Sequence, residues 1–462
     1  MLRFFNNLTL QEEVFEPLQP GVVRLYTCGP TVYDYAHIGN FRTFVFDDLL
    51  RRYLKYKGYR VTQVMNITDV DDKTIAGSRA EGVSLKEYTG RYTKAFFEDI
   101  QTLNVELAEY YPAATDHIAE MVELVKRLGA KGYTYEVGRS TYFRIASFPE
   151  YGKLSRVIVD KDASAFSRVD ADEYGKEAAR DFALWKAWSE ADGDVAWDTE
   201  IGRGRPGWHI ECSAMSMKYL GEQFDIHTGG IDNMFPHHEN EIAQSEAATG
   251  KPFVKCWLHC QHLLVDNRKM SKSLGNYYTL RDLLARGYKP RAIRYELLST
   301  HYRQQHNFTL EGLKASGQSL QRLLDFMASL RRSAGDESAI SDLLAMTEVN
   351  FELSLDDDLN ISAALAATFD FVREANRLMA EGKFGPGNAR DAAAMLRKFD
   401  AVLGLLEEEP VRFDDEIKRL VEEREDARRA KNYSRADAIR AELRARGYIV
   451  EDTPEGPHLR EA

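Results

Sequence analysis

Residues 22–40 read VVRLYTCGPTVYDYAHIGN, and this stretch decides the fold. The apolar run 22–28 predicts a buried strand, and the glycines and proline that follow predict a turn before a helix. Gly58 ends that helix, and 61–67 predicts a second strand. A strand–helix–strand unit indicates an α/β fold with a doubly wound, Rossmann-type parallel sheet. Two rows of apolar residues, spaced by four, mark the helix: Val45, Leu49 and Tyr53, and Phe46, Leu50 and Leu54.

The chain of 462 residues is too long for one ordinary domain. A charge-rich stretch from about 115 to 205 lacks clear strand–helix alternation and predicts an inserted subdomain. From about 290 onward the pattern is helical nearly throughout, with breaks expected at 382–387 and 407–410. Further strand patterns lie at 224–228, 253–259 and 263–265. The predicted division is 1–114, 115–205, 206–300, 301–405 and 406–462.

Composition narrows the class of protein. The formal net charge of −12 argues mildly against a nucleic-acid partner, although local basic clusters decide that question. Glu12, Glu13 and Glu16 make the N-terminus too acidic for a signal peptide, and no apolar run has the length of a membrane span. Four cysteines in a chain this long make no disulfide framework. We therefore expect a cytoplasmic protein that does not bind membranes.

His37-Ile38-Gly39-Asn40 lies between the first predicted strand and the helix that follows it. Such strand ends collect nucleotides, and a helix N-terminus offers unpaired N–H groups and a positive dipole end to phosphates. Gly39 lets the backbone approach closely, and His37 can donate a hydrogen bond to a phosphate oxygen. Alone the tetrapeptide is weak evidence for a catalytic site, because a capped helix start after a tight turn is the simpler explanation.

Lys269-Met270-Ser271-Lys272-Ser273 follows the strand pattern at 263–265. Two lysines separated by small residues can fold over a triphosphate and neutralise the charge that develops as pyrophosphate leaves. Most short lysine runs are solvated loops. This five-residue motif, however, occurs together with the His37 motif, and the pair is a far more specific signal of a nucleotide-binding site. Together the two motifs resemble the ATP-binding signatures of class I aminoacyl-tRNA synthetases. The resemblance implies ATP-binding roles for His37, Gly39, Asn40, Lys269 and Lys272, with His37, Lys269 and Lys272 catalytic. That class often has a second histidine where Asn40 stands.

Four residues with metal-binding chemistry lie in three parts of the chain. His237 and Glu241, four apart after Pro236, lie on one face of a predicted helix. Cys28 ends the first strand, and Cys212 stands at the opening of another predicted helix. Two thiolates, an imidazole and a carboxylate suit tetrahedral zinc. Spacing alone does not join the four, since a free cysteine is more often a small core residue.

Other donors compete for the same role. His238 and Glu239 adjoin the pair, and His238 with Glu241, three apart, is also geometrically possible. Cys256 and Cys260 are four apart, but their segment has a strand pattern, so we interpret them as structural.

Longer motifs make the resemblance specific. They are 28–40, NITDVDDK at 66–73, DFALWK at 181–186, GWHIECS at 207–213 and the stretch 229–241. With them the chain resembles the cysteinyl-tRNA synthetases almost from end to end. The resemblance implies that Thr68 and Trp208 line the amino-acid pocket and that Asp232 meets the substrate's ammonium group. Packing for Trp208 and turn capping for Asp232 are the simpler alternatives. The family resemblance also implies one zinc ion per chain, held by Cys28, Cys212, His237 and Glu241.

The implied zinc has a physical purpose. A cysteine substrate can offer the metal a thiolate, whereas the hydroxyl of nearly isosteric serine is a much poorer ligand. Protein synthesis needs discrimination of about 10⁴ or more, which corresponds to about 5.5 kcal/mol and exceeds what pocket shape supplies. We therefore expect zinc to select the substrate without an editing domain, for which the inserted stretch is too small and polar.

The C-terminal segment is locally basic. Between 424 and 446 arginines and lysines outnumber acidic residues, and Tyr433 and Tyr448 add surfaces on which bases can stack. Composition alone favours a solvated helical pair with ion pairs. The tail, however, resembles the small anticodon-binding domain of the same family, and 301–405 resembles its tRNA-positioning helical bundle. The implied tRNA-binding residues are Arg428, Arg429, Tyr433 and Arg435.

The expected reaction activates L-cysteine with ATP as cysteinyl adenylate and transfers it to the 3′ end of cysteine tRNA. Mg²⁺ should accompany ATP, no general base stands out, and a monomer is the family expectation. A ligase that joins cysteine to an amino sugar in mycothiol synthesis would share the motifs but lack the basic tail. A non-catalytic RNA-binding or zinc-binding paralogue would not retain both ATP motifs. A small-molecule nucleotidyltransferase leaves the metal cluster and the tail unexplained.

Overall fold

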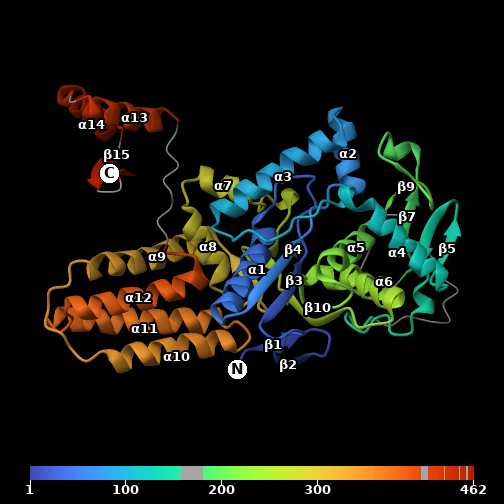
Figure 1. Ribbon diagram of the computed structural model, residues 1–462, viewed down its shortest axis with the longest axis horizontal. Helices are drawn as coiled ribbons and strands as arrows, with labels where there is room; N and C mark the ends of the chain where they lie inside the picture. Colours follow the sequence, from blue (N-terminus) through green and yellow to red (C-terminus); the bar gives the residue numbers. More distant parts are fainter. Residues whose placement is uncertain (158–179, 407–414, 431, 447, 454–455, 462) are drawn as a thin grey trace. The chain divides into compact units, whose positions relative to one another are not determined.

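The computed structural model describes residues 1–157, 180–406, 415–430, 432–446, 448–453 and 456–461. The chain divides into two compact units, 1–406 and 407–462 (Figure 1). Each unit has its own apolar core. The break predicted at 407–410 lies outside the described residues.

A four-stranded parallel sheet organises the first unit. Its strand order is β11-β10-β3-β4, and each neighbouring pair is parallel. The order reverses between β3 and β10, and open α/β sheets bind ligands outside the carboxyl ends of their strands at such a point. The predicted Rossmann-type class is confirmed. The strands are β3 (Val22–Thr27), β4 (Arg60–Met65), β10 (Phe224–Gly230) and β11 (Val254–Cys260).

Alternate strand residues enter two different cores, one on each face of this sheet. Leu25 and Ile226 pack in the core that contains the apolar side of α1 (Ile38–Tyr56). Tyr26, the neighbour of Leu25, packs in the core that contains the helices drawn in teal and green in Figure 1. Those helices are α4 (Ile118–Ala130), α5 (Trp208–Leu220) and α6 (Glu239–Thr249).

Between β4 and β10 the chain leaves the parallel sheet. The stretch 115–205, whose sequence pattern shows no alternation, contains α4 and an antiparallel sheet of order β5-β6-β7-β9-β8. Its strands are short, so they produce little periodicity in the sequence. The elements here are α2 (Asp72–Glu81), α3 (Leu85–Thr102), η1 (Ala114–His117), β5 (Thr134–Val137), β6 (Ser140–Phe143), η2 (Ile145–Ser147), β7 (Phe182–Ala187), η3 (Glu190–Asp192), β8 (Trp197–Thr199) and β9 (Gly202–Pro206).

A small three-stranded sheet carries the lysine motif. Its middle strand, β12, pairs antiparallel with β13 and parallel with β14. The N-terminal hairpin β1–β2 forms a separate two-stranded sheet. The remaining elements of this region are β1 (Arg3–Asn6), β2 (Gln11–Val14), β12 (Leu263–Val265), β13 (Arg268–Lys269), η6 (Lys272–Leu274), α7 (Leu280–Ala285), α8 (Pro290–Leu298) and β14 (His306–Phe308).

Four helices, drawn in gold to orange-red in Figure 1, lie side by side as a bundle at the end of the first unit. Phe351 and Phe399 stack at its centre with ring centroids 3.9 Å apart. The helices are α9 (Leu310–Leu330), α10 (Ser341–Asp356), α11 (Ile361–Ala380) and α12 (Pro386–Leu403).

The second unit pairs two helices with an antiparallel hairpin, β15–β16, which the helical sequence pattern does not reveal. Its core is small and includes Ile417, Leu420, Ile439, Leu443 and Val450. The elements are α13 (Asp415–Arg429), α14 (Tyr433–Ala445), β15 (Tyr448–Thr453) and β16 (Gly456–Glu461).

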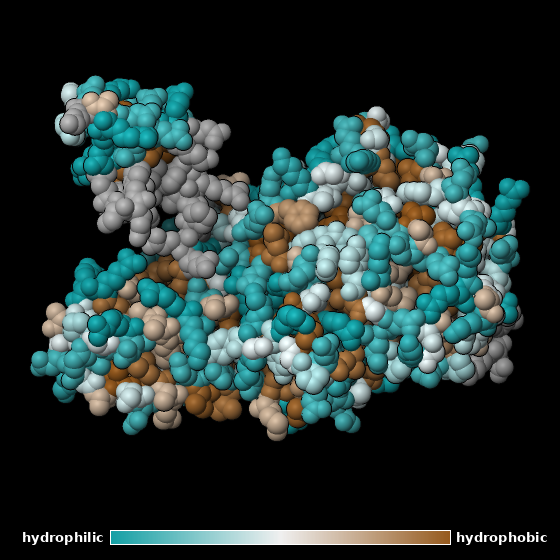
Figure 2. Space-filling model, in the orientation of Figure 1, coloured by the Kyte–Doolittle hydropathy of each residue, from teal (hydrophilic) through white to brown (hydrophobic). Residues whose placement is uncertain are grey.

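The surface in Figure 2 is largely hydrophilic, with smaller apolar areas between the polar residues. Among the described residues, no helix combines the length and the apolar character needed to cross a bilayer.

Candidate functional site

Four buried side chains gather at the carboxyl ends of β3 and β10. Cys28 follows β3, Cys212 lies in α5, and Glu241 lies in α6. His237 comes from the short turn η5 (Met234–His238), and its Nε2 is 3.1 Å from Glu241 Oε1. One donor atom from each of the four lies within 4.8 Å of the others. The residues that the sequence scattered over three regions therefore form one buried cluster, which is compatible with a metal site.

A second group of donors overlaps with the first. Cys28 and Glu241 also form a group with His227 and His238, again within 4.8 Å. His238 Nε2 is 3.2 Å from Cys28 Sγ, and His227 Nε2 is 3.1 Å from Glu241 Oε2. His238 is the competitor that spacing left open. His227 was not found from the sequence, because only the pairing of β10 beside β3 brings it near Cys28.

Electrostatics within the cluster favours one thiolate and one imidazolium. Burial would raise the pKa of Cys212, but a hydrogen bond with Cys28 and the charge of His237 hold this pKa well below its ordinary value. The same hydrogen bond, together with burial, raises the pKa of Cys28. Burial would lower the pKa of His237, but the charges of Cys212 and Glu241 raise it. The lowered pKa of Cys212 favours its deprotonated form, whose charge a bound cation would compensate.

Of the predicted pocket residues, Trp208 lies against this cluster, and Thr68 is bonded to Glu211, the neighbour of Cys212. The Trp208 ring stacks on the His237 ring with centroids 4.1 Å apart and an angle of 18°. The Thr68 hydroxyl donates to Glu211 Oε2 at 3.1 Å and accepts from Asn66 Nδ2 at 3.0 Å. Trp208 therefore has a packing role, which was the simpler alternative, and its stacking also fixes the plane of the His237 ring.

Three neighbours of the site were missed from the sequence. Asn66 Oδ1 accepts the Gly29 N–H at 2.8 Å, which fixes the backbone beside Cys28. Glu211 is fully buried next to Cys212. His209 Nδ1 lies 2.9 Å from His237 Nδ1. All three belong to the motifs 66–73 and 207–213, so the motifs contained the signal but gave no reason to choose these residues.

Asp232 lies in the turn η4 (Ile231–Asn233) directly after β10 and is exposed. A side chain at Gly230 would meet Asp232 Oδ1 at 2.6 Å, and one at Gly229 would meet the His238 ring at 2.8 Å. The glycine pair therefore leaves room for both polar side chains at the strand end. The Asp232 charge also acts to raise the pKa of His37, so the carboxylate lies near the first ATP motif.

His37 is the N-cap of α1. Its Nδ1 accepts the Asn40 N–H at 3.2 Å, and Asn40 Oδ1 accepts the His37 N–H at 3.1 Å. Burial lowers the pKa of His37, which favours the neutral ring. Because Nδ1 accepts, the ring proton resides on Nε2, where it can be donated to a ligand. The helix cap and the phosphate donor are thus compatible interpretations of one residue.

The two ATP motifs are in contact. A side chain at Gly39 would lie 3.0 Å from His37 Cε1 and 3.4 Å from Met270 Cε, so this glycine allows the lysine motif to approach. The first motif is also bonded to the segment that follows the lysine motif, since the Ile38 N–H donates to Tyr278 O at 3.0 Å. Two segments more than 200 residues apart in the sequence therefore meet at this point.

Lys269 and Lys272 are both exposed. Lys272 Nζ forms an ion pair with Asp34 Oδ2 at 2.6 Å and lies 5.1 Å from the centre of the Tyr277 ring. Lys269 ends β13, and its carbonyl accepts from Asn276 Nδ2 at 3.2 Å. Lys272 is therefore held close to the loop that precedes His37, where a triphosphate would need it.

Comparisons with known proteins agree with this geometry. The family model for the class I (C) tRNA synthetase catalytic domain matches residues 14–318. A DALR domain model matches 350–407, and a cysteinyl-tRNA ligase anticodon binding domain model matches 411–460. A cysteine–tRNA ligase of Protochlamydia amoebophila is 50% identical over 468 residues, which cover 99% of this chain and 98% of the relative.

The chain belongs to the cysteine–tRNA ligases.

Other members of this family are equally similar. The cysteine–tRNA ligase of Brachyspira hyodysenteriae is 50% identical over 470 residues, covering 98% of each chain. Among solved structures, the methionyl-tRNA synthetase of Mycobacterium tuberculosis matches with a TM-score of 0.59 at 16% identity, covering 82% of this chain and 89% of that one. The latter likeness concerns the fold. The chain is thus a class I aminoacyl-tRNA synthetase whose partners are cysteine, ATP and cysteine tRNA.

The four tail residues predicted to bind tRNA lie on α13 and α14. Tyr433 is 62% exposed. Each arginine has an acidic neighbour: Arg428 with Glu425 at 3.6 Å, Arg429 with Asp426 at 2.8 Å, and Arg435 with Glu423 at 3.2 Å. Exposed pairs of this kind contribute little to stability, so these guanidinium groups can exchange a carboxylate for a phosphate at low cost.

Proposed function

We propose that this cysteine–tRNA ligase selects its substrate with a zinc ion held by Cys28, Cys212, His237 and Glu241. The buried cluster at the sheet's switch point is the observation that carries the proposal. Two sulfurs, an imidazole and a carboxylate match the donor set that zinc prefers. Zinc held there would supply a thiophilic partner for the cysteine side chain, which the serine hydroxyl satisfies far less well.

The chain's own residues orient the amino acid around that cluster. Trp208, stacked on His237, closes one side of the pocket, and Thr68 is fixed by its bonds to Asn66 and Glu211. Asp232, exposed at the end of β10, is placed to receive the substrate's ammonium group. These contacts would leave the cysteine carboxylate directed toward the ATP motifs.

The ATP motifs would then position the triphosphate, accompanied by Mg²⁺. His37 Nε2–H donates to a phosphate oxygen, Gly39 and Asn40 keep the helix start open, and Lys269 and Lys272 neutralise charge on departing pyrophosphate. The carboxylate of cysteine attacks the α-phosphate and displaces pyrophosphate. The terminal ribose hydroxyl then attacks the acyl carbon and displaces AMP, and a phosphate oxygen of the adenylate can take up the hydroxyl proton, so we name no side chain as general base. Positioning and electrostatics supply the catalysis.

The same proposal extends to the domains. Residues 1–114 and 206–300 form the two halves of the catalytic domain, 115–205 the insertion, 301–405 the bundle and 406–462 the anticodon-binding domain. The separation into compact units at 406 supports the last boundary. Arg428, Arg429, Tyr433 and Arg435 are proposed as tRNA contacts. Four free, buried cysteines support a cytoplasmic location.

The test is charging of purified cysteine tRNA with radiolabelled cysteine by wild type and Cys212→Ser, with and without excess serine. Wild type should charge the tRNA, retain one zinc per chain by elemental analysis, and ignore serine. Cys212→Ser should lose both zinc and charging. Wild type with full activity but no bound metal would overturn the zinc proposal. Cysteine-dependent ATP–pyrophosphate exchange without transfer to tRNA would instead point to an amino-sugar ligase.

A further inference from the structure

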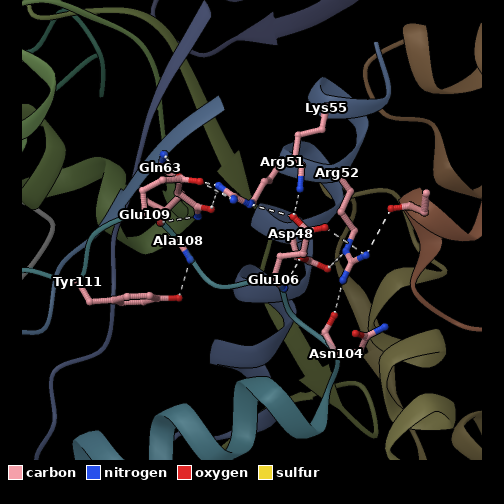
Figure 3. A network of polar contacts seen from close by, with 12 residues as sticks. Asp48, Arg51, Arg52, Lys55, Gln63, Asn104, Glu106, Ala108, Glu109 and Tyr111 are labelled. Atoms are coloured by element: carbon pink, nitrogen blue, oxygen red, sulfur yellow. Dashed lines mark hydrogen bonds and ion pairs between the residues drawn. The ribbon is translucent and has the colours of Figure 1, made fainter. Parts of the chain in front are cut away.

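The last turn of α12 is capped by polar side chains from the catalytic part of the chain. Figure 3 labels three residues of this region, Asp48, Arg52 and Asn104. A helix leaves its final carbonyls without partners, and its C-terminus carries partial negative charge. Here three such carbonyls have partners: Ala401 O accepts from Arg52 Nη1 at 3.4 Å, Leu403 O from Arg294 Nε at 2.8 Å and Gly404 O from Asn104 Nδ2 at 3.0 Å. We call Asp48, Arg52, Asn104 and Arg294 the α12 joint.

Asp48 holds the two arginines of the α12 joint in place. Its Oδ2 accepts from Arg52 Nε at 2.8 Å and from Arg294 Nη2, while its Oδ1 accepts the Glu106 N–H at 2.8 Å. Arg52 Nη2 and Arg294 Nη1 also both donate to Asn104 O, at 2.8 and 3.1 Å. Asp48, Arg52 and Arg294 are all buried. A buried ion pair with its remaining donors satisfied resists changes in geometry, since neither partner can be left alone.

The α12 joint connects both ATP motifs to one point. Asp48 and Arg52 belong to α1, the helix that begins at the His37 motif. Arg294 belongs to α8, which follows the lysine motif after α7. The end of α12 in turn leads along the chain to residues 411–460, which match the anticodon-binding domain. A force applied through the chain at residue 406 first meets Asp400, whose Oδ1 accepts the N–H groups of Leu405 and Leu406 at 2.6 and 2.7 Å, and then the joint.

We propose that the α12 joint is a positioning element for the transfer of cysteine to tRNA and not for the activation of cysteine. The inference rests on the proposed function. A tRNA bound to the C-terminal unit would act on the end of α12 along the chain, whereas cysteine and ATP would bind at the strand ends. The first half of α1 is held independently by buried side chains against the sheet, such as Phe41 and Val45. Weakening the joint should therefore uncouple the two half-reactions.

Two substitutions weaken the α12 joint from opposite sides without leaving a buried charge unpaired. Asn104 has a φ of +55°, which glycine adopts without strain, so Asn104→Gly removes little beyond the amide bond to Gly404 O. Gly404 has a φ of +64°, and a Cβ there would lie 3.0 Å from both Arg294 Nη2 and Asn104 Nδ2. Gly404→Ala therefore displaces the joint from the α12 side.

Lys398→Ala is the matched control. Lys398 also lies on α12, but it is half exposed and pairs only loosely with Glu348 and Glu352, at 3.6 and 3.8 Å. It removes a cation from the same helix without touching the joint. Melting temperatures of all variants show whether the fold is retained. Asn104→Asp replaces the donor to Gly404 O with a charged acceptor, and it should slow transfer at least as much as Asn104→Gly does.

The measurement separates the two half-reactions in the full-length enzyme. In Asn104→Gly and Gly404→Ala, cysteine-dependent ATP–pyrophosphate exchange should stay within about twofold of wild type. Single-turnover transfer from preformed cysteinyl adenylate to cysteine tRNA should slow about tenfold. The tRNA concentration that gives half of the maximal transfer rate should change by less than about twofold. Lys398→Ala should match wild type in both assays.

Equal losses in exchange and transfer would overturn the proposal, because they indicate a general structural role for the joint. Unchanged transfer in both folded variants would overturn it as well. Failure of the proposed function looks different: wild type itself would then perform exchange but transfer nothing to tRNA.

Discussion

At the scale of single residues, the cluster offers two overlapping donor groups, and substitution can separate them. Cys212→Ser and His237→Gln each remove a donor of the proposed group, so both should retain less than about a tenth of the wild-type zinc, in line with the loss expected for a ligand. His227→Gln and His238→Gln should retain zinc near one ion per chain. Elemental analysis of dialysed protein gives the values. Loss of zinc in His238→Gln but not in His237→Gln would assign the ion to the alternative group.

Thr68 permits a test of the amino-acid pocket that leaves the cluster intact. Thr68→Val keeps the shape but removes the hydroxyl that bridges Asn66 and Glu211. Loss of a buried hydrogen bond costs about 1–3 kcal/mol, so KM for cysteine in pyrophosphate exchange should rise about tenfold. KM for ATP should not change. A parallel rise in both constants would show that Thr68 supports the fold and not the pocket.

Asp47 introduces a pH dependence of stability. Its Oδ1 accepts the Thr228 hydroxyl at 2.6 Å, and burial raises its pKa from 3.8 to about 8. Between about pH 4 and pH 8 the folded chain therefore retains a proton that the unfolded chain has lost, so this contribution to stability is present at low pH and is lost as pH rises. In Asp47→Asn the contribution is absent. The Tm of the variant minus that of wild type should increase by several degrees from pH 5 to pH 8 in calorimetry, and a constant difference would contradict the raised pKa.

At the scale of elements, the contact between the two ATP motifs depends on Gly39. Alanine favours a helix over glycine by about 1 kcal/mol, so Gly39→Ala should not lower the melting temperature. Its Cβ would, however, press on His37 and Met270, at 3.0 and 3.4 Å. KM for ATP should rise about tenfold while KM for cysteine stays near wild type. A variant with normal ATP affinity would show that the two motifs need not touch.

Elements differ in how well the sequence reveals them. The strands predicted at 22–28, 61–67, 224–228, 253–259 and 263–265 match β3, β4, β10, β11 and β12 to within two residues. Strands of a parallel sheet are buried on both faces and therefore stand out as apolar runs. The hairpin β15–β16 and the strands β5, β6, β8 and β9 are antiparallel or short, and their residues carry no comparable run. β7 does contain a buried apolar run, residues 182–185, which was not predicted as a strand.

The site was predictable only in part. His237 and Glu241 share a helical face, which spacing reveals, but the choice of Cys28 and Cys212 came from the family resemblance. His227 comes close only through strand pairing, and Arg294 meets Asp48 across 246 positions of sequence. Such contacts depend on how the elements pack together, and no local pattern encodes them.

At the scale of the whole molecule, the two compact units should divide the reaction. Each has its own core, so a chain ending at residue 406 should fold. It should retain cysteine-dependent pyrophosphate exchange within about threefold of the full chain. Charging of tRNA should fall at least about a hundredfold, which corresponds to about 2.7 kcal/mol of lost binding and positioning. Full charging by the shortened chain would show that residues 407–462 are dispensable for recognition.

The donor cluster also sets an order of events during synthesis. Cys28 leaves the ribosome about 200 residues ahead of Glu241, with the antiparallel sheet made in between. At about 5–20 residues per second this interval lasts about 10–40 s. A nascent chain therefore lacks the complete set of four donors for that whole time. An ion that needs all four donors could therefore bind only after both halves of the parallel sheet have met, too late to act as a folding nucleus.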